Sequence, residues 1–220
     1  MKNVNRKKEI VIWILLLAPF IYAFFIWNKV PERLPTHFNI HGEADDYSSK
    51  ALALLVLPAT NILVYFIMLL IPRIDPRRKN YEQFSVSYQN IRLVVHLFFV
   101  AIFIYVSSAI LYNRTLYMNA FLAGVMLFLA LLGNYMRTVR SNWFFGIRTP
   151  WTLSNDVVWR KTNELGGRIM FYSGLLLAVS VLFLPEIAGA VVVGVGVFIM
   201  IIIPVVYSYF EYKKVMKQPE

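Results

Sequence analysis

The sequence contains no cysteine, and this absence removes several kinds of chemistry at once. It excludes disulfides, thiolate metal sites, a cysteine nucleophile and palmitoylation. Charged residues are also scarce, at 15% of 220 residues, whereas soluble domains average about 25%. Hydrophobic residues make up 59% of the chain, and the mean hydropathy is +0.59. The composition therefore argues against a water-soluble globular protein.

Acidic residues are fewer than basic ones, with 12 Asp and Glu against 22 Lys and Arg, which gives a formal net charge of +10. In so hydrophobic a chain, this excess indicates basic loops facing an anionic membrane surface rather than a nucleic-acid interface. We therefore expect the lipid bilayer as a partner and no direct binding of nucleic acid. No pattern in the sequence calls for a cofactor.

Long hydrophobic runs are the feature that the sequence has in abundance. Crossing about 30 Å of hydrocarbon takes about 20 helical residues, and six runs come close to this length or exceed it. They cover residues 10–27, 51–71, 93–112, 117–136, 169–184 and 187–209. Because the runs are continuous rather than alternating in polarity, they favour helices over a barrel. The sequence predicts an all-α polytopic membrane protein, a bundle of about six transmembrane helices.

The basic residues predict the orientation of this bundle, since Lys and Arg accumulate on the cytoplasmic side of a membrane. Eighteen of the 22 fall on one side of the predicted spans. The other side carries only Lys29, Arg33, Lys50 and Arg114. With an even number of spans, both termini are expected in the cytoplasm. We divide the chain into an N-terminal region (1–72) with outer loop 29–50, a basic linker (73–92) and a four-span region (93–209) with inner loop 137–168.

The outer loop, KVPERLPTHFNIHGEADDYSSK, is predicted to be an extended, turn-rich segment because of its prolines and Gly42. Its polar groups suit recognition of a ligand better than catalysis, since no nucleophile and base are recognisably arranged. A metal site is the alternative, with His37 and His41 as ligands completed by Asp45 or Asp46. The prolines and glycine disfavour one helix presenting both histidines, and no third histidine is nearby.

The inner loop, RTVRSNWFFGIRTPWTLSNDVVWRKTNELGGR, has two parts. The first is aromatic and basic. The second begins at Ser154, a good N-cap residue, and Gly166 and Gly167 are expected to end it. We predict a short interfacial helix here, with Trp159 anchored at the lipid headgroups. Two interpretations remain open: a docking surface for a cytoplasmic protein, and a surface helix that only braces the bundle.

Both loops resemble known families. The outer loop is similar to a small prokaryotic domain of unknown function that begins many bacterial membrane proteins, through its proline-bounded turn, glycine, acid and final Ser-Lys. The stretch GNYMRTVRSNWFFGIRTPWTLSNDVVW resembles the hallmark of the SdpI family, immunity proteins against a secreted killing factor of bacilli. The string GIRTPWTL is the most specific part of this resemblance, which covers nearly the whole chain.

The resemblance implies a multi-pass protein of the bacterial inner membrane that is not an enzyme. It implies protection against a secreted peptide toxin and, with toxin bound, capture of a cytoplasmic autorepressor at the membrane. The candidates on the toxin side are Pro35, His37, His41, Gly42, Asp45, Asp46, Ser49 and Lys50. The candidates for a cytoplasmic partner are Asn142, Gly146, Arg148, Thr149, Pro150, Trp151, Thr152 and Trp159.

Two other functions are weighed against this one. A small transporter or flippase of amphiphilic compounds would use the proline-containing second and sixth spans to line a path, but the ionisable midplane residue typical of such a path is missing. A metalloenzyme built on His37 and His41 is the third hypothesis.

Overall fold

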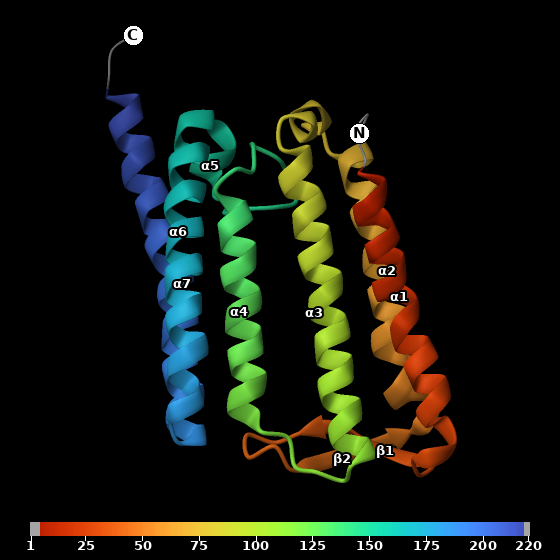
Figure 1. Ribbon diagram of the computed structural model, residues 1–220. Coiled ribbons are helices and arrows are strands. Elements are labelled where there is room, and N and C mark those ends of the chain that lie inside the picture. Colours follow the sequence, from red (N-terminus) through yellow and green to blue (C-terminus); the bar gives the residue numbers. More distant parts are fainter. Residues whose placement is uncertain (1–4, 218–220) are drawn as a thin grey trace.

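The structure is a computed structural model that describes residues 5–217, and it shows a bundle of long helices with a small β-hairpin at one end (Figure 1). The elements are α1 (Arg6–Ile26), η1 (Trp27–Lys29), β1 (Arg33–Phe38), β2 (Ala44–Ser49), α2 (Lys50–Ile74), η2 (Arg78–Glu82), α3 (Ser85–Leu111), α4 (Met118–Met136), α5 (Pro150–Ser154), α6 (Asp156–Ser180), η3 (Val181–Phe183) and α7 (Glu186–Met216). Six of the helices are long and apolar enough to cross a membrane. The prediction of a polytopic helical membrane protein is confirmed.

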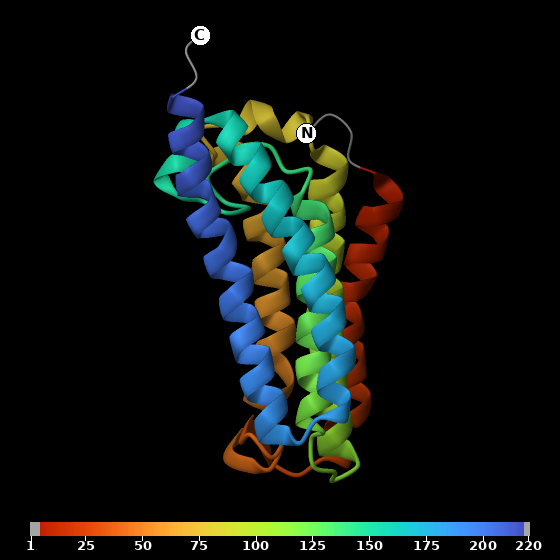
Figure 2. The same ribbon diagram turned by 90° about the vertical axis from the view of Figure 1, so that its left-hand side faces the viewer.

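The long helices form two groups of three. One group contains α1, α2 and α3, the other contains α4, α6 and α7, and the groups meet where α3 faces α4. Figure 2 views the bundle from the side of α7 and shows that the first and last helices have their chain ends at the same end of the molecule, opposite the hairpin. We call these the termini end and the hairpin end.

A hydrophobic cluster joins the two groups at the termini end. Met68 from α2 and Tyr88 from α3 pack in it with Val139 of the α4–α5 loop and Trp159 of α6. Tyr88 donates a hydrogen bond from its hydroxyl to the carbonyl of Met68 at 2.5 Å. Aromatic side chains bury large areas, so this cluster is a major source of stability between the groups.

Helix α6 corrects the sequence prediction for the inner loop. The predicted helix from Ser154 to the glycines is not a separate element. Asn155 caps α6, and the helix continues through Gly166 and Gly167 to Ser180. These glycines do not end the helix but allow close packing: a Cβ on Gly167 would lie 2.6 Å from the carbonyl oxygen of Gly133 in α4. The short helix in this loop is α5 instead.

The outer loop also differs from the prediction, because it forms an antiparallel hairpin of β1 and β2. Arg33 donates to the carbonyl of Tyr47 across the strands at 3.0 Å, and the hydroxyls of Thr36 and Ser48 are 3.2 Å apart. The register shifts after Pro35, which lacks an N–H for the ladder. Cross-strand polar pairs support the hairpin, and buried Leu34 packs it into a hydrophobic cluster with Ala23, Ile26, Leu54 and Phe103.

Helix α3 begins earlier than predicted, at Ser85 rather than Leu93, and so brings Arg92 into the bundle. The Arg92 side chain is fully buried and forms an ion pair with Glu9 in the first turn of α1. Its guanidinium lies 5.2 Å from the centre of the Tyr65 ring. One turn further along α3, buried His96 contacts Asn61 of α2 through Nδ1 at 2.7 Å. A polar cluster thus ties α1, α2 and α3 together.

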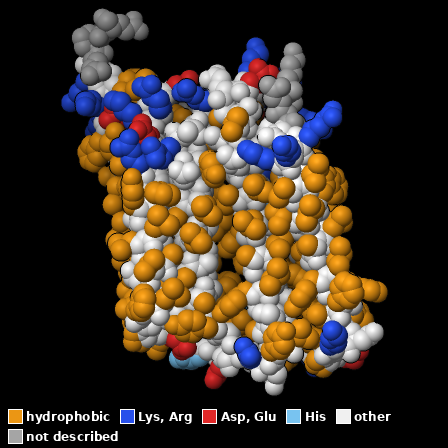
Figure 3. Space-filling view, in the orientation of Figure 1, with side chains coloured by type: hydrophobic (Ala, Val, Ile, Leu, Met, Phe, Trp, Pro, Cys, Tyr) orange, Lys and Arg blue, Asp and Glu red, His pale blue; other side chains and the backbone are white. Residues whose placement is uncertain are grey.

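The charges of the two ends differ strongly. Figure 3 shows Lys and Arg gathered at the termini end and hydrophobic side chains along the length of the helices. The four basic residues assigned to the outer side, Lys29, Arg33, Lys50 and Arg114, lie in the elements of the hairpin end. Lys2, one of the other 18, lies outside the described residues. The up-and-down path of the helices therefore places the two sets of basic residues at opposite ends, as the sequence indicated.

Candidate functional site

The loop between α4 and α6 folds into a compact structure around Asn142, which is fully buried. Its side-chain amide donates to the carbonyls of Arg140 at 2.9 Å and Phe145 at 3.1 Å. Its Oδ1 accepts the backbone N–H groups of Phe144 at 2.8 Å and Phe145 at 2.7 Å. One side chain therefore replaces the backbone partners that an irregular loop lacks.

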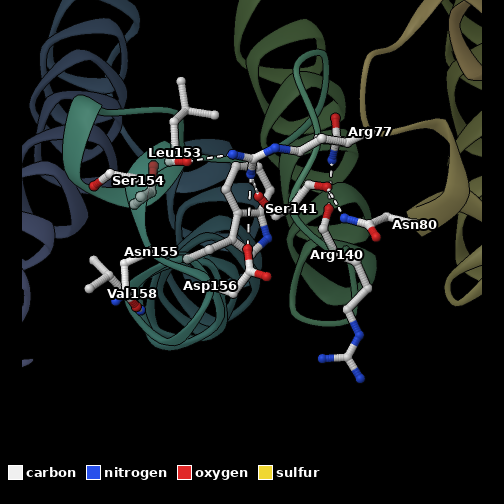
Figure 4. A network of polar contacts seen from close by, with 12 residues as sticks. Arg77, Asn80, Arg140, Ser141, Leu153, Ser154, Asn155, Asp156 and Val158 are labelled. Atoms are coloured by element: carbon white, nitrogen blue, oxygen red, sulfur yellow. Dashed lines mark hydrogen bonds and ion pairs between the residues drawn. The ribbon is translucent and has the colours of Figure 1, made fainter. Parts of the chain in front are cut away.

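Arg77, after α2, connects this loop to α5 and α6 (Figure 4). Its guanidinium donates to the carbonyl of Leu153 at 2.5 Å and to the hydroxyl of Ser141, and it lies 3.9 Å from the Asp156 carboxylate. Asn80 donates to the carbonyl of Ser141 at 2.7 Å. The linker between α2 and α3 is thus part of the site, and it belongs to the other helix group.

Asp75 is the buried acceptor of this network, with 1% of its surface exposed. It accepts the N–H of Arg77 at 2.7 Å, the N–H of Trp143 at 3.0 Å and the hydroxyl of Tyr81 at 2.9 Å. Burial, followed by the hydrogen bond to Asp75 and its charge, raises the pKa of Tyr81 above its ordinary value. The phenol therefore stays protonated and keeps its role as donor.

We expect Asp75→Ala to release the α4–α5 loop, because three donors lose a charged acceptor, whereas Tyr81→Phe removes only one of the three bonds. Each bond to a charged group contributes about 1.5–3 kcal/mol. Amide hydrogen exchange over residues 140–149 should become much faster in Asp75→Ala and only slightly faster in Tyr81→Phe. Equal protection in Asp75→Ala and the unmodified protein would contradict the role of this carboxylate.

The surroundings of Gly146 and Trp159 explain why a glycine and a tryptophan occupy these two positions of the hallmark. Gly146 has φ +103°, and a Cβ there would lie 2.5 Å from Oδ1 of Asn163. That oxygen accepts the N–H of Ile147 at 2.7 Å. Trp159 is 1% exposed and donates from Nε1 to the carbonyl of Val139 at 2.9 Å. The expectation that Trp159 lies at the lipid headgroups is wrong, because α6 turns this ring into the bundle.

The segment Thr149 to Thr152 links the loop to α7. Thr149 and Thr152 form a capping box at the start of α5, with Pro150 at its first turn. The hydroxyl of Thr149 lies 3.0 Å from that of buried Ser208 in α7. Trp151 contacts the ring of Tyr209, with 5.1 Å between ring centres. Four hallmark residues therefore fasten α5, directly or by capping, to the last helix.

An exposed tip remains on this largely buried loop. Trp143 and Phe144 are 47% and 36% exposed, and exposed Arg148 donates to the carbonyl of Trp143. We call these three residues the aromatic tip. Of the eight hallmark candidates, only Arg148 belongs to this surface, and the others named above support it from below or connect it to α7.

The sequence analysis missed several residues of the network, because their partners are distant in the chain. They are Asp75, Arg77, Tyr81, Ser141 and Asn163. A polar residue directly after an apolar span is the one signal that could have indicated Asp75.

At the hairpin end, the two histidines contact different carboxylates. Nδ1 of His37 lies 2.5 Å from Asp45 within the hairpin, and Nδ1 of His41 lies 2.8 Å from Glu186 at the start of α7. Within residues 5–217, no group of three or more His, Cys, Asp or Glu is arranged to hold a metal ion. The geometry therefore gives no support to the metal-site alternative.

The hairpin tip bridges the two helix groups. The N–H of Leu116, in the α3–α4 loop, donates to the carbonyl of Gly42 at 3.0 Å. Gly42 has φ +73°, and a Cβ there would lie 1.8 Å from the Leu116 oxygen, so only glycine fits. With the His41 contact to α7, the tip fastens α1–α3 to the other group.

The other outer candidates stabilise the hairpin and its junction with α2. Lys50 donates to Glu32 at 2.7 Å and lies over the Trp27 ring. Asp46 accepts the N–H of Tyr47 at 2.8 Å, and Ser49 caps α2. These contacts are local.

A pocket of about 540 Å³ lies between the hairpin and the α3–α4 loop. Its lining combines apolar, aromatic and cationic side chains, including Pro35, Phe38, Tyr47, Arg33 and Arg114. We call it the hairpin pocket. Aromatic and cationic groups in a concave surface suit a ligand with apolar and electron-rich or anionic parts.

The comparisons with known proteins agree with the two loops. Residues 138–208 match the SdpI/YfhL protein family, and this segment contains the α4–α6 loop, α6 and most of α7. This part of the chain is therefore similar to that family. Residues 14–62 match a domain of unknown function, DUF1648. The predicted resemblance is confirmed for both parts of the chain.

A curated relative extends the similarity beyond these segments. The immunity protein SdpI of Bacillus subtilis (strain 168) is 26% identical over 208 residues, which cover 94% of this chain and 97% of the relative. No solved structure gives a significant match. The similarity to an immunity protein thus includes the hairpin, the two helix groups and the buried loop.

Proposed function

We propose that this protein is an immunity protein of the bacterial cell membrane, which binds a secreted peptide toxin at its hairpin end. The observation that carries the proposal is the nearly end-to-end similarity to the immunity protein SdpI. The termini end, where the basic residues gather, would face the cytoplasm, and the hairpin end would face outward.

The hairpin pocket supports this assignment through its chemistry. It is a concave surface at the end of the bundle that would face an arriving toxin, and it offers aromatic rings beside Arg33 and Arg114. A hydrophobic peptide with a carboxylate could place its apolar side chains on the rings and its charge on the arginines.

Helix α7 gives a physical route from this pocket to the opposite end. Its first residue, Glu186, contacts His41 of the hairpin tip, and Ser208 and Tyr209 contact the segment Thr149–Thr152. If the hairpin tip has two conformations and the toxin binds one of them more tightly, toxin binding would favour that conformation. The change would move α7 and, through it, the aromatic tip. The aromatic tip would then be the contact for a cytoplasmic repressor.

The test is protection of a toxin-sensitive bacterial strain that expresses the protein. We expect survival with the unmodified protein and at least a tenfold loss of surviving cells with Arg33→Gln/Arg114→Gln. The matched control is Arg73→Gln/Arg78→Gln, which removes two arginines from the termini end. Arg148→Ala should preserve protection but abolish toxin-dependent induction of a repressor-controlled reporter.

Two outcomes would count against the proposal. Unchanged killing at normal membrane levels of the unmodified protein would remove the immunity function. Equal protection by the Arg33/Arg114 variant and its control would remove the hairpin pocket as the toxin site.

The transporter alternative receives no support from the packing. The two proline-containing helices that were to line its path, α2 and α7, lie in different helix groups. The cleft between the groups is almost entirely apolar.

A further inference from the structure

A cleft runs along the line where α3 faces α4, and Figure 3 shows it as a hollow walled by hydrophobic side chains. Its volume is about 290 Å³. The lining is Val94, Leu97, Phe98, Ala101, Ile102, Tyr105, Ala120, Phe121, Gly124, Leu127, Phe128 and Leu131. From Val94 to Tyr105 it extends about 16 Å at 1.5 Å per helical residue. This is close to half of the roughly 30 Å hydrocarbon thickness of a bilayer.

Two polar pockets lie beyond the cleft toward the termini end. Ser87 lies two helical turns before Val94 on α3, and Asn134 lies one turn after Leu131 on α4, so both follow the faces that line the cleft. They border a pocket of about 420 Å³ together with Arg137. A second pocket, of about 440 Å³, shares Arg137 and adds Arg140 and Arg160.

The polar pockets carry an excess of positive charge. Arg137, Arg140 and Arg160 are exposed, and none of them forms an ion pair within the described residues 5–217. The pockets also contain Asp156 and Glu164, but Arg77 lies 3.9 Å from Asp156, and Arg168 lies 2.5 Å from Glu164. Three guanidinium groups are therefore left to bind an anion, and guanidinium fits phosphate through paired hydrogen bonds.

We propose that the α3–α4 cleft and its arginine pockets form a binding site for an anionic phospholipid of the leaflet at the termini end. An acyl chain lies in the apolar cleft, and the phosphate contacts Arg137, with Arg140 and Arg160 nearby. The apolar cleft lies between α3 and α4, and the unpaired arginines lie beyond its end toward the termini: Arg137 directly follows α4, Arg140 is in the next loop and Arg160 is on α6. An amphiphile requires this order of apolar and cationic groups. Neither a free phosphate nor an acidic peptide uses the apolar part.

The proposed site also predicts the effect of replacing Gly124, which lines the cleft. A Cβ on Gly124 meets no atom within 4 Å, so Gly124→Leu fills the cleft without disturbing the helix packing. Gly194 in α7 offers the same open space, and Gly194→Leu is its matched control. Arg73→Gln/Arg78→Gln is the control for Arg137→Gln/Arg140→Gln, because it removes two arginines from the same end but outside the pockets.

The experiment is native mass spectrometry of the full-length protein in detergent, titrated with phosphatidylglycerol or with phosphatidylcholine of the same acyl chains. We expect at least tenfold tighter binding of phosphatidylglycerol. Arg137→Gln/Arg140→Gln should lose this preference, and Gly124→Leu should weaken binding of the first lipid at least fivefold. Both control variants should bind as the unmodified protein does, and all variants should elute as single peaks in size-exclusion chromatography.

Several outcomes overturn the proposal. Equal affinity for the two lipids removes the phosphate contact, and an equal loss in the two arginine variants removes the pocket as its location. Equal binding by Gly124→Leu and the unmodified protein removes the cleft. If inorganic phosphate or glycerol phosphate competes as well as the lipid does, the site belongs to a soluble anion instead.

Discussion

Replacing Arg92 by methionine should destabilise the folded protein by about 3–5 kcal/mol, the usual result when one partner of a buried ion pair is removed. Arg92 is fully buried and pairs with Glu9, whose side chain is only 19% exposed. The change leaves the carboxylate inside the helix bundle without its counter-charge. Denaturant unfolding in detergent micelles, followed by circular dichroism, measures the loss.

The control for this prediction is the double variant Glu9→Gln/Arg92→Met. It removes both charges, so we expect it to recover more than half of the lost stability, because a pair of neutral side chains carries no desolvation cost of an isolated charge. Arg73→Met, at an exposed position, should change stability by about 0.5 kcal/mol or less. If Arg92→Met behaved like Arg73→Met, the ion pair would not be what joins α1 to α3.

The second large effect is expected for Gly167→Leu, which places a side chain between two helix backbones. A Cβ at this position would lie 2.6 Å from the oxygen of Gly133 and 3.1 Å from the nitrogen of Arg137. Because backbone atoms cannot rotate away as a side chain would, α4 and α6 must separate. We expect a loss of about 3 kcal/mol or more, at the upper end of overpacking effects.

The measurement is the yield of folded, monodisperse protein and its thermal unfolding midpoint in detergent. Gly194→Leu, in α7, adds the same side chain to a helix where no neighbouring atom lies within 4 Å, and it should leave both quantities unchanged. An equal fall in the two variants would mean that leucine acts through the membrane or the helix, not through the α4–α6 contact.

The sequence predicted the membrane spans well, because twenty apolar residues have few alternatives to a helix in lipid. It failed at the hairpin. The strands of 33–38 and 44–49 have no clean apolar alternation, and the hairpin contacts residues distant in sequence, such as Leu116, 74 residues beyond Gly42. It also misjudged Gly167, since a glycine that ends a helix and one that admits a neighbouring backbone look the same in sequence.

The candidate site was predicted in part. The string around Arg148 was identified as the specific motif, but the burial of Asn142, Thr152 and Trp159 was not foreseen. The neighbouring residues Trp143 and Leu153 bond to Asp75 and Arg77, which lie more than 60 residues earlier in the chain. Local sequence therefore pointed to the loop, and tertiary contacts decided which of its side chains face solvent.

The fastening of the two helix groups has a mechanical consequence. The boundary between α3 and α4 contains the apolar cleft, with the rings of Phe98 and Phe128 stacked across it at 4.0 Å between ring centres. Both ends of this boundary are held: Gly42 and His41 connect the helix groups at one end, and the aromatic cluster around Trp159 connects them at the other. Because the two helix groups are connected at both ends, they cannot open by a hinge motion about one end while all these contacts remain. A hinge motion of one helix group must first break the contacts at one end. The contacts of the hairpin tip, one backbone hydrogen bond and one histidine contact, are the weaker set.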